Sequence, residues 1–168
     1  YGSGTRENSS SLPTIIKPLN SFTNGDIIRV KNTGTVGTRL FWAGKIRDMH
    51  LRGNTAATSQ WGISFRDSTG AIVAIQDTAL IADLLIWGCY SGGIEQTNAA
   101  LPLMISRIKL LWNNGYGIKL TSGANLAQSL NFTDISGDGN NGGLLYFNGL
   151  DANGSLTIIN LKSERRVN

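Results

Sequence analysis

The sequence predicts an all-β fold, a solenoid of parallel strands with about 25 residues per coil, within the range of known repeat proteins. Two observations support it. Two short motifs recur together along the chain at nearly the same spacing, and the chain holds 21 glycines with many Asn, Ser and Thr residues but no collagen-like period. Repeated motifs indicate repeated structure, and residues that tolerate positive φ suit the many tight turns of a solenoid.

The first motif has six positions and occurs five times. It holds a branched apolar residue, two residues of any type, an apolar residue (once Thr), one residue of any type and another branched apolar residue. Its copies begin at Ile46, Ile81, Ile105, Leu130 and Leu156, in steps of 35, 24, 25 and 26. A second motif, Gly followed by Ile or Leu, begins at Gly62, Gly93, Gly117 and Gly143, in steps of 31, 24 and 26.

The first motif predicts a β-strand that bends where it begins. Its last two apolar positions alternate with mostly polar neighbours, as in a half-buried strand. The extra residue after the first apolar position breaks this alternation, which suits a bend or bulge. One coil cannot bury its apolar side alone, but coils stacked at the strand spacing of ~4.8 Å form a continuous core.

Two of these segments, residues 78–87 and 99–112, also have helix-forming composition. Pro102 opposes a helix in the second, and both segments contain the repeated motif at its usual spacing. The pattern therefore favours strands over helices at both places.

Composition narrows the classes of function. The net charge of +4 is spread along the chain, without the basic stripe of a nucleic-acid-binding protein. No apolar run approaches the length of a membrane-spanning helix, so we expect no membrane insertion. Cys89 is the only cysteine and His50 the only histidine, which leaves no disulfide framework and no metal-ligand spacing. We expect no metal or other cofactor, and we expect Cys89 to be buried and inert.

The chain divides into three predicted parts. Residues 1–11 form a flexible arm or linker. Residues 12–44 form a capping or irregular first coil with a short strand over 26–30, and residues 45–168 form the regular coils. The long first step between motifs is attributed to a loop inserted at 53–60. Because no cap is recognisable after the last motif, we expect a fragment of a longer chain, or cover from neighbouring chains.

Outward-facing residues of successive motifs should form columns across the coils. One predicted column is Asp48, Asp83, Arg107, Phe132 and Ile158, and the next is His50, Leu85, Lys109, Asp134 and Asn160. Neighbouring carboxylates on adjacent strands raise one pKa, as acid and nucleophile pairs in glycoside cleavage require. Asp48 and Asp83 are therefore the predicted catalytic pair, although an ordinary surface ion pair between Asp83 and Arg107 is the alternative. Arg107 and Lys109, beside these two carboxylates, are predicted to hold the substrate, an acidic sugar, or to act as base and charge stabiliser in a lyase.

Four aromatic residues occupy related positions near the coil corners. Trp87 and Trp112 follow the first motif, and Trp61 and Tyr116 precede the glycine of the second. Sugars place their apolar C–H faces on exposed aromatic rings, so these four residues are predicted to bind a glycan. The alternative is that they fill corners of the core or a contact between chains.

The two motifs, as in residues 81–86 followed by Gly93-Ile94, resemble those of the right-handed parallel β-helix of pectate-lyase-like proteins. The Gly, Asn, Ser and Thr content and the lack of disulfides most resemble bacteriophage tailspikes, over residues 45–162. The resemblance implies a homotrimer on a virion, acting outside the host cell, that binds and often hydrolyses bacterial surface polysaccharide (O-antigen or capsule) as an endoglycosidase.

Two alternatives stay open at this stage. One alternative to the tailspike segment is a non-enzymatic structural or trimerisation module of a phage fibre. The other is a bacterial polysaccharide lyase or hydrolase with the same fold, because a fold does not fix a function.

Overall fold

A computed structural model describes residues 14–30, 39–42, 44–65, 74–76, 79–97, 103–121, 129–148 and 155–164. Within these residues the chain forms thirteen strands and no helix. Six strands form one parallel sheet, in the order β1 (Ile15–Ile16), β4 (Lys45–Arg52), β7 (Ala79–Trp87), β9 (Leu103–Leu111), β11 (Ser129–Asp138) and β13 (Ser155–Glu164).

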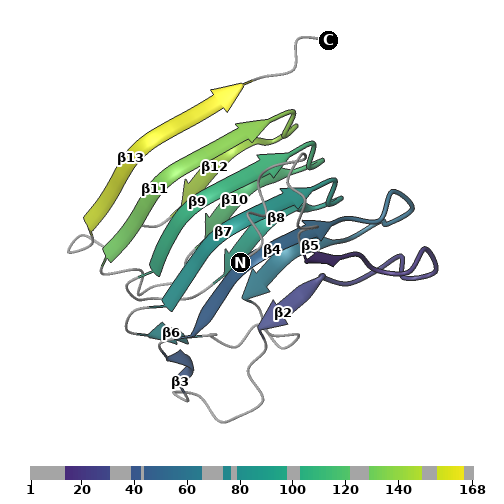
Figure 1. Ribbon diagram of the computed structural model, residues 1–168, viewed down its shortest axis with the longest axis horizontal. Coiled ribbons are helices and arrows are strands. Elements are labelled where there is room, and N and C mark those ends of the chain that lie inside the picture. The colour runs from purple at the N-terminus through teal and green to yellow at the C-terminus, as the bar shows by residue number, and fades with distance from the viewer. Residues whose placement is uncertain are drawn as a thin grey trace.

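Five strands form a second parallel sheet, in the order β12 (Gly143–Asn148), β10 (Tyr116–Thr121), β8 (Gly92–Thr97), β5 (Trp61–Phe65) and β2 (Ile28–Val30). A third, two-stranded sheet pairs β3 (Arg39–Trp42) with β6 (Ala74–Gln76). The chain passes alternately through the first and second sheets, and each return places a strand beside the previous one in parallel (Figure 1). This arrangement is consistent with a parallel β-solenoid.

The core consists of aliphatic columns that run from strand to strand. Ile81 pairs with Ile46 and Ile105, and Leu84 pairs with Met49 and Ile108. The side chains of the central strands β7 and β9 in these columns are fully or almost fully buried, and Met49 packs against them from β4. The strands predicted over the two segments of helix-forming composition are confirmed, because columns of this kind require the alternation of a strand.

A bend is present in every long strand of the first sheet from β4 onward, but it lies near the middle of the strand and not, as predicted, where the strand begins. One residue in each of these strands has φ between 53° and 60°, in the left-handed region. The bend lets two consecutive side chains point outward before the inward alternation resumes. The five residues are Asp48, Asp83, Arg107, Asp134 and Asn160.

The predicted alignment of the fourth motif is wrong by two positions. Ile105 pairs with Phe132, and Leu130 pairs with Leu103. Phe132 is consequently a core residue with no exposed surface, although the sequence placed it in an outward column. Asp134 and Asn160 therefore join the column of Asp48, Asp83 and Arg107, and Ser136 and Lys162 join that of Lys109. From Ile81 onward, partners in successive strands then follow one another in steps of 24, 27 and 26.

In the second sheet, the predicted alignment of the second motif is wrong by one position at Gly143. Gly143 pairs with Tyr116 rather than with Gly117, so this step is 27 as well.

The extra length of the first step is divided between two places. Arg52 and Trp61 are nine positions apart, against five for Trp87 and Gly92, and the remaining excess lies between Ile63 and Ile81, where β6 lies. The predicted inserted loop at 53–60 therefore accounts for only part of it.

The structure describes the three predicted parts of the chain to different extents. Residues 1–11, the predicted arm, lie outside the described residues. From the predicted capping region, β1 lies at the edge of the first sheet and β2 at the edge of the second. Cys89 is buried against the core, as predicted, and burial raises the pKa of its thiol to about 12.

Candidate functional site

A groove with a volume of about 380 Å³ lies where the first sheet ends at a corner of the coil. Three consecutive residues of β11 lie along its middle, and residues of the neighbouring strands β9 and β13 flank them. The lining residues are Lys109, Leu111, Trp112, Ser136, Gly137, Asp138, Lys162 and Glu164.

The pairing of the strands explains why this surface is hollow. Ser136 lies between Lys109 and Lys162, so a short side chain separates two long ones. Gly137, between Leu110 and Ser163, faces inward, where a side chain would collide with Leu144. The flanking strands are about 10 Å apart at the backbone, which is twice the usual strand spacing. The groove therefore follows β11 and has taller side chains on both sides.

Trp112 stands at the end of the groove, and 45% of its surface is exposed. Its φ of 55° is left-handed, which costs a non-glycine residue roughly 1–2 kcal/mol. The residues at the same corner in the neighbouring coils are Gly88 and Gly139, with φ of 70° and 65°. Trp112 thus has a conformation that glycine adopts without strain.

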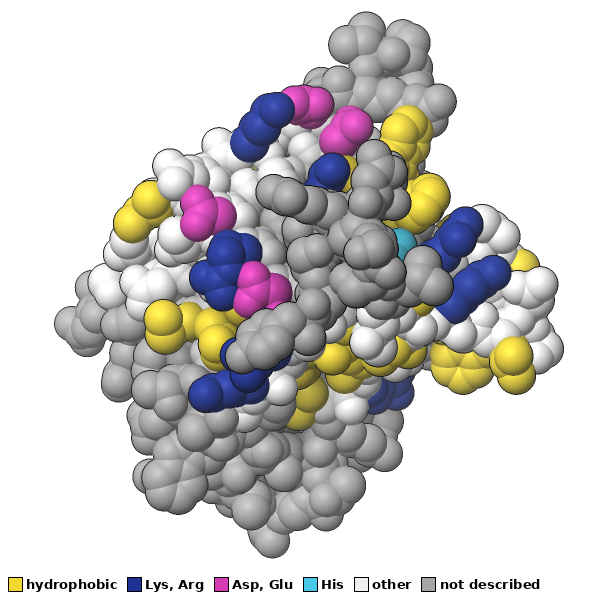
Figure 2. All heavy atoms as spheres, viewed as in Figure 1, with side chains coloured by type: hydrophobic (Ala, Val, Ile, Leu, Met, Phe, Trp, Pro, Cys, Tyr) yellow, Lys and Arg dark blue, Asp and Glu magenta, His cyan; other side chains and the backbone are white. Residues whose placement is uncertain are grey.

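The charged groups of the groove are balanced. Lys162 and Glu164 form an ion pair with 2.5 Å between Nζ and Oε1. This hydrogen bond raises the pKa of Lys162 and lowers that of Glu164. Lys109 and Asp138 add one charge of each sign. Charges of both signs are also interspersed over the face shown in Figure 2, where no basic stripe gathers among the described residues. Such a groove offers both donors and acceptors for hydrogen bonds with hydroxyl groups.

The predicted carboxylate pair belongs to the column of bends, away from this groove. Arg107 donates two hydrogen bonds to Asp83, of 2.6 and 2.7 Å, and these lower the pKa of the Asp83 carboxyl. Arg47 lies 3.4 Å from Asp48. A general acid requires a raised pKa, so the geometry of Asp83 suits an ion pair better than that role. The catalytic roles of Asp48 and Asp83 stay predictions.

The four predicted aromatic residues do not share one surface. Trp61 is buried and its ring lies over Gly92, where a side chain would collide with it. Trp87 stacks with His50 at 6.3 Å between ring centroids and lies beneath Arg52. Tyr116 packs against Tyr146 at 4.9 Å. Trp112 alone among the four lines the groove, together with the predicted Lys109.

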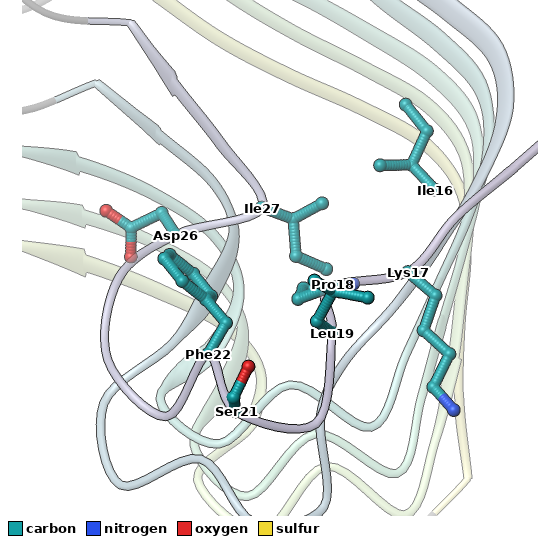
Figure 3. Close-up of a pocket in the computed structure, with 8 residues that line it drawn as sticks. All are labelled: Ile16, Lys17, Pro18, Leu19, Ser21, Phe22, Asp26 and Ile27. Carbon is teal, nitrogen blue, oxygen red and sulfur yellow. The ribbon is translucent and has the colours of Figure 1, made fainter.

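A larger hollow of about 490 Å³ is lined by the end of β1 and by the single loop that joins β1 to β2. Figure 3 shows Ile16, Pro18 and Ile27 around this space, with the side chain of Lys17 directed away from it. The Asp26 carboxylate accepts hydrogen bonds from the backbone N–H of Trp61 and from Ser64 Oγ. Both oxygens of this carboxylate therefore take part in contacts that support the fold. This hollow is the open, apolar end of the coil stack and offers few polar groups to a ligand.

Six of the eight lining residues were not predicted from the sequence, and four of these six are polar or charged: Ser136, Asp138, Lys162 and Glu164. In the corrected alignment, Ser136 and Lys162 lie in the column of Lys109, and Asp138 and Glu164 lie in the column of Leu111. Asp134 could have given that alignment, because Asp and Asn are the residues that tolerate a left-handed bend best.

Comparison with family models, with curated proteins and with solved structures found no match. Among the described residues, no helix has both the length and the apolar character to cross a membrane, and no three His, Cys, Asp or Glu side chains gather as metal ligands.

Proposed function

We propose that the chain is a polysaccharide-binding segment of a right-handed, tailspike-type parallel β-helix, which recognises bacterial surface polysaccharide in the groove beside Trp112. The observation that carries the proposal is the exposed Trp112 ring, held in a strained conformation at the end of a groove with hydroxyl, carboxylate and ammonium groups. Strain at an exposed residue is a reason to look for a function.

The chemistry of a sugar matches this groove. A pyranose ring presents an apolar C–H face, which packs on an indole, and a rim of hydroxyl groups, which form hydrogen bonds. Asp138 and Ser136 supply acceptors, and Lys109 supplies donors. The resemblance of the repeated motifs to those of tailspikes indicates the source of the glycan as a bacterial surface, and implies a homotrimer on a virion.

Binding to O-antigen and capsular polysaccharides from a panel of bacteria tests the proposal by calorimetry. We expect Trp112→Ala to weaken binding at least tenfold, because truncation removes the stacking surface. Tyr90→Ala is the matched control, since Tyr90 is 46% exposed at a corner one coil earlier and does not line the groove. Unchanged binding by Trp112→Ala would contradict the proposal.

Cleavage of the glycan is the less supported part of the predicted activity. Cleavage would release reducing ends from a bound polysaccharide. If Asp48 and Asp83 are the catalytic pair, Asp48→Asn and Asp83→Asn should each abolish this release. Activity that survives both substitutions would exclude them. The ion pair of Asp83 with Arg107 favours binding without cleavage as the function of this segment.

A structural or trimerisation module of a fibre is the second candidate. It is favoured by β13, whose aliphatic side chains Leu156, Ile158, Ile159 and Leu161 are all exposed. Light scattering of the purified chain distinguishes a trimer from a monomer. A trimer that binds no polysaccharide in the panel would support this second function over the first.

A further inference from the structure

A column composed mainly of asparagine side chains runs along the corner of the coils, at the turn that carries Trp112. Strand pairing places Asn54, Cys89, Asn113 and Asn140 at equivalent corners of successive coils. Three of these four are asparagines, and each asparagine forms hydrogen bonds with the backbone of the turn in the preceding coil. The column is thus a repeated device for closing turns.

Asn140 closes the turn that carries Trp112. Its Nδ2 donates to the carbonyl oxygen of Leu110 at 2.8 Å. Its Oδ1 accepts from the backbone N–H of Asn113 at 3.3 Å and from Asn113 Nδ2 at 2.8 Å. One amide therefore bridges the two sides of the turn, with Trp112 between them. The backbone N–H of Trp112 donates to the carbonyl oxygen of Asp138 at 2.9 Å, which ties the same turn to β11.

The same arrangement recurs one coil earlier. Asn113 is fully buried, and its Oδ1 accepts from the backbone N–H of Cys89 at 2.9 Å while its Nδ2 lies 3.5 Å from the carbonyl oxygen of Ile86. These groups bracket Gly88, which is left-handed like Trp112. Two turns that are bridged by an asparagine amide therefore hold a left-handed residue.

Cys89 provides an internal comparison. It occupies the position that would bridge the turn containing Gly53, but a thiol cannot span a turn with paired donor and acceptor groups. Gly53 is not left-handed, although it stands at the same corner as Gly88 and Trp112. Gly139 is left-handed as well, which glycine achieves about as readily as negative φ. Trp112 has no such freedom and depends on its bridge.

We infer that Asn140 is a positioning residue that holds Trp112 in its left-handed conformation and thereby orients the indole ring toward the groove. The ring orientation is a property of the turn, whereas its consequence for glycan affinity rests on the proposed function. A binding residue that loses its supporting contacts loses the orientation that binding requires.

Asn140→Ala tests the inference, with Asn141→Ala as the matched control. Asn141 is the next residue in the same turn, and its Nδ2 donates to Asn114 Oδ1 at 2.8 Å without bridging residues 110–113. The readout is the NMR shift of the Gly139 Hα protons, because the Trp112 ring lies against Gly139. We expect Asn140→Ala to lose the ring-current shift and to bind polysaccharide at least tenfold more weakly, whereas Asn141→Ala keeps both.

Other outcomes are also decisive. A ring-current shift that survives Asn140→Ala overturns the inference whatever the glycan does. Unchanged affinity after the ring has moved leaves the positioning role in place and contradicts the proposed binding role of Trp112. If the shift is lost but the unaltered protein binds no polysaccharide, the positioning role stands and the proposed function fails. Should Asn140→Ala not fold, Asn140→Asp keeps the acceptor but loses the donor to Leu110, and a reduced ring-current shift is then expected.

Discussion

At the scale of single residues, this protein is organised by backbone conformation at its corners. Asp and Asn tolerate left-handed φ because their short polar side chains can form local hydrogen bonds. This explains Asp48, Asp83, Asp134 and Asn160 at the bends without a catalytic role. Arg107 occupies the same column without that advantage, and its bidentate ion pair with Asp83 is the contact that supports it.

The free-energy cost of a left-handed non-glycine residue at the corner can be measured at Gly88. A Cβ atom added there would meet no other atom within 4 Å, so Gly88→Ala isolates the backbone cost. We expect a loss of roughly 1–2 kcal/mol in the free energy of unfolding. Gly53→Ala should cost more, because its Cβ would collide with the carbonyl oxygen of Gly88. Urea denaturation of both variants checks this, and equal losses would contradict it.

The ion pair of Asp83 predicts a small pH dependence of stability. The Arg107 hydrogen bonds lower the pKa of Asp83, so the pair stabilises the fold fully above the ordinary value of 3.8. This stability is lost as pH falls through the lower folded pKa. Because both side chains are partly exposed to solvent, which screens the pair, we expect Asp83→Asn to cost at most about 1 kcal/mol at neutral pH. The difference from the unaltered protein should shrink in acid and in high salt, and a constant difference would contradict the assignment.

At the scale of strands, the hydrophobic pattern identified the elements but not their alignment. A shift of one position turns a strand inside out, so it is visible in the pattern. A shift of two positions leaves every side chain on its own side, and Leu130 and Phe132 are both acceptable partners for Ile105. The sequence therefore predicted five strands of the first sheet correctly and misaligned the last two. Lys109 and Trp112 of the groove were predicted, but their neighbours on β11 and β13 were not.

The alignment itself can be tested at Phe132. In the predicted outward column its truncation would be almost neutral, whereas in the observed core Phe132→Ala should cost about 3–5 kcal/mol. Asn131→Ala, in the adjacent and partly exposed position, is the control and should change stability by less than about 1 kcal/mol. Comparable small effects of both substitutions in denaturant titrations would restore the alignment with Leu130.

At the scale of the whole molecule, stability depends on contacts between successive coils. Among the described residues, β13 pairs with β11 on one side only. Ile135 in β11 and Leu161 in β13 occupy the same column, yet Ile135 is fully buried and Leu161 is 44% exposed. The two residues therefore report directly on whether β13 is covered by another chain in solution.

For a monomeric chain we expect Ile135→Ala to cost about 2–5 kcal/mol and Leu161→Ala to cost less than about 1 kcal/mol, because the second truncation leaves no cavity. Denaturant titrations at low and high protein concentration measure both. If Leu161→Ala costs as much as Ile135→Ala, and only at high concentration, another copy covers β13 and adds its own contacts to the free energy of unfolding. That result would favour the fibre module, since a surface that exists to join chains must lose stability when its aliphatic side chains are removed.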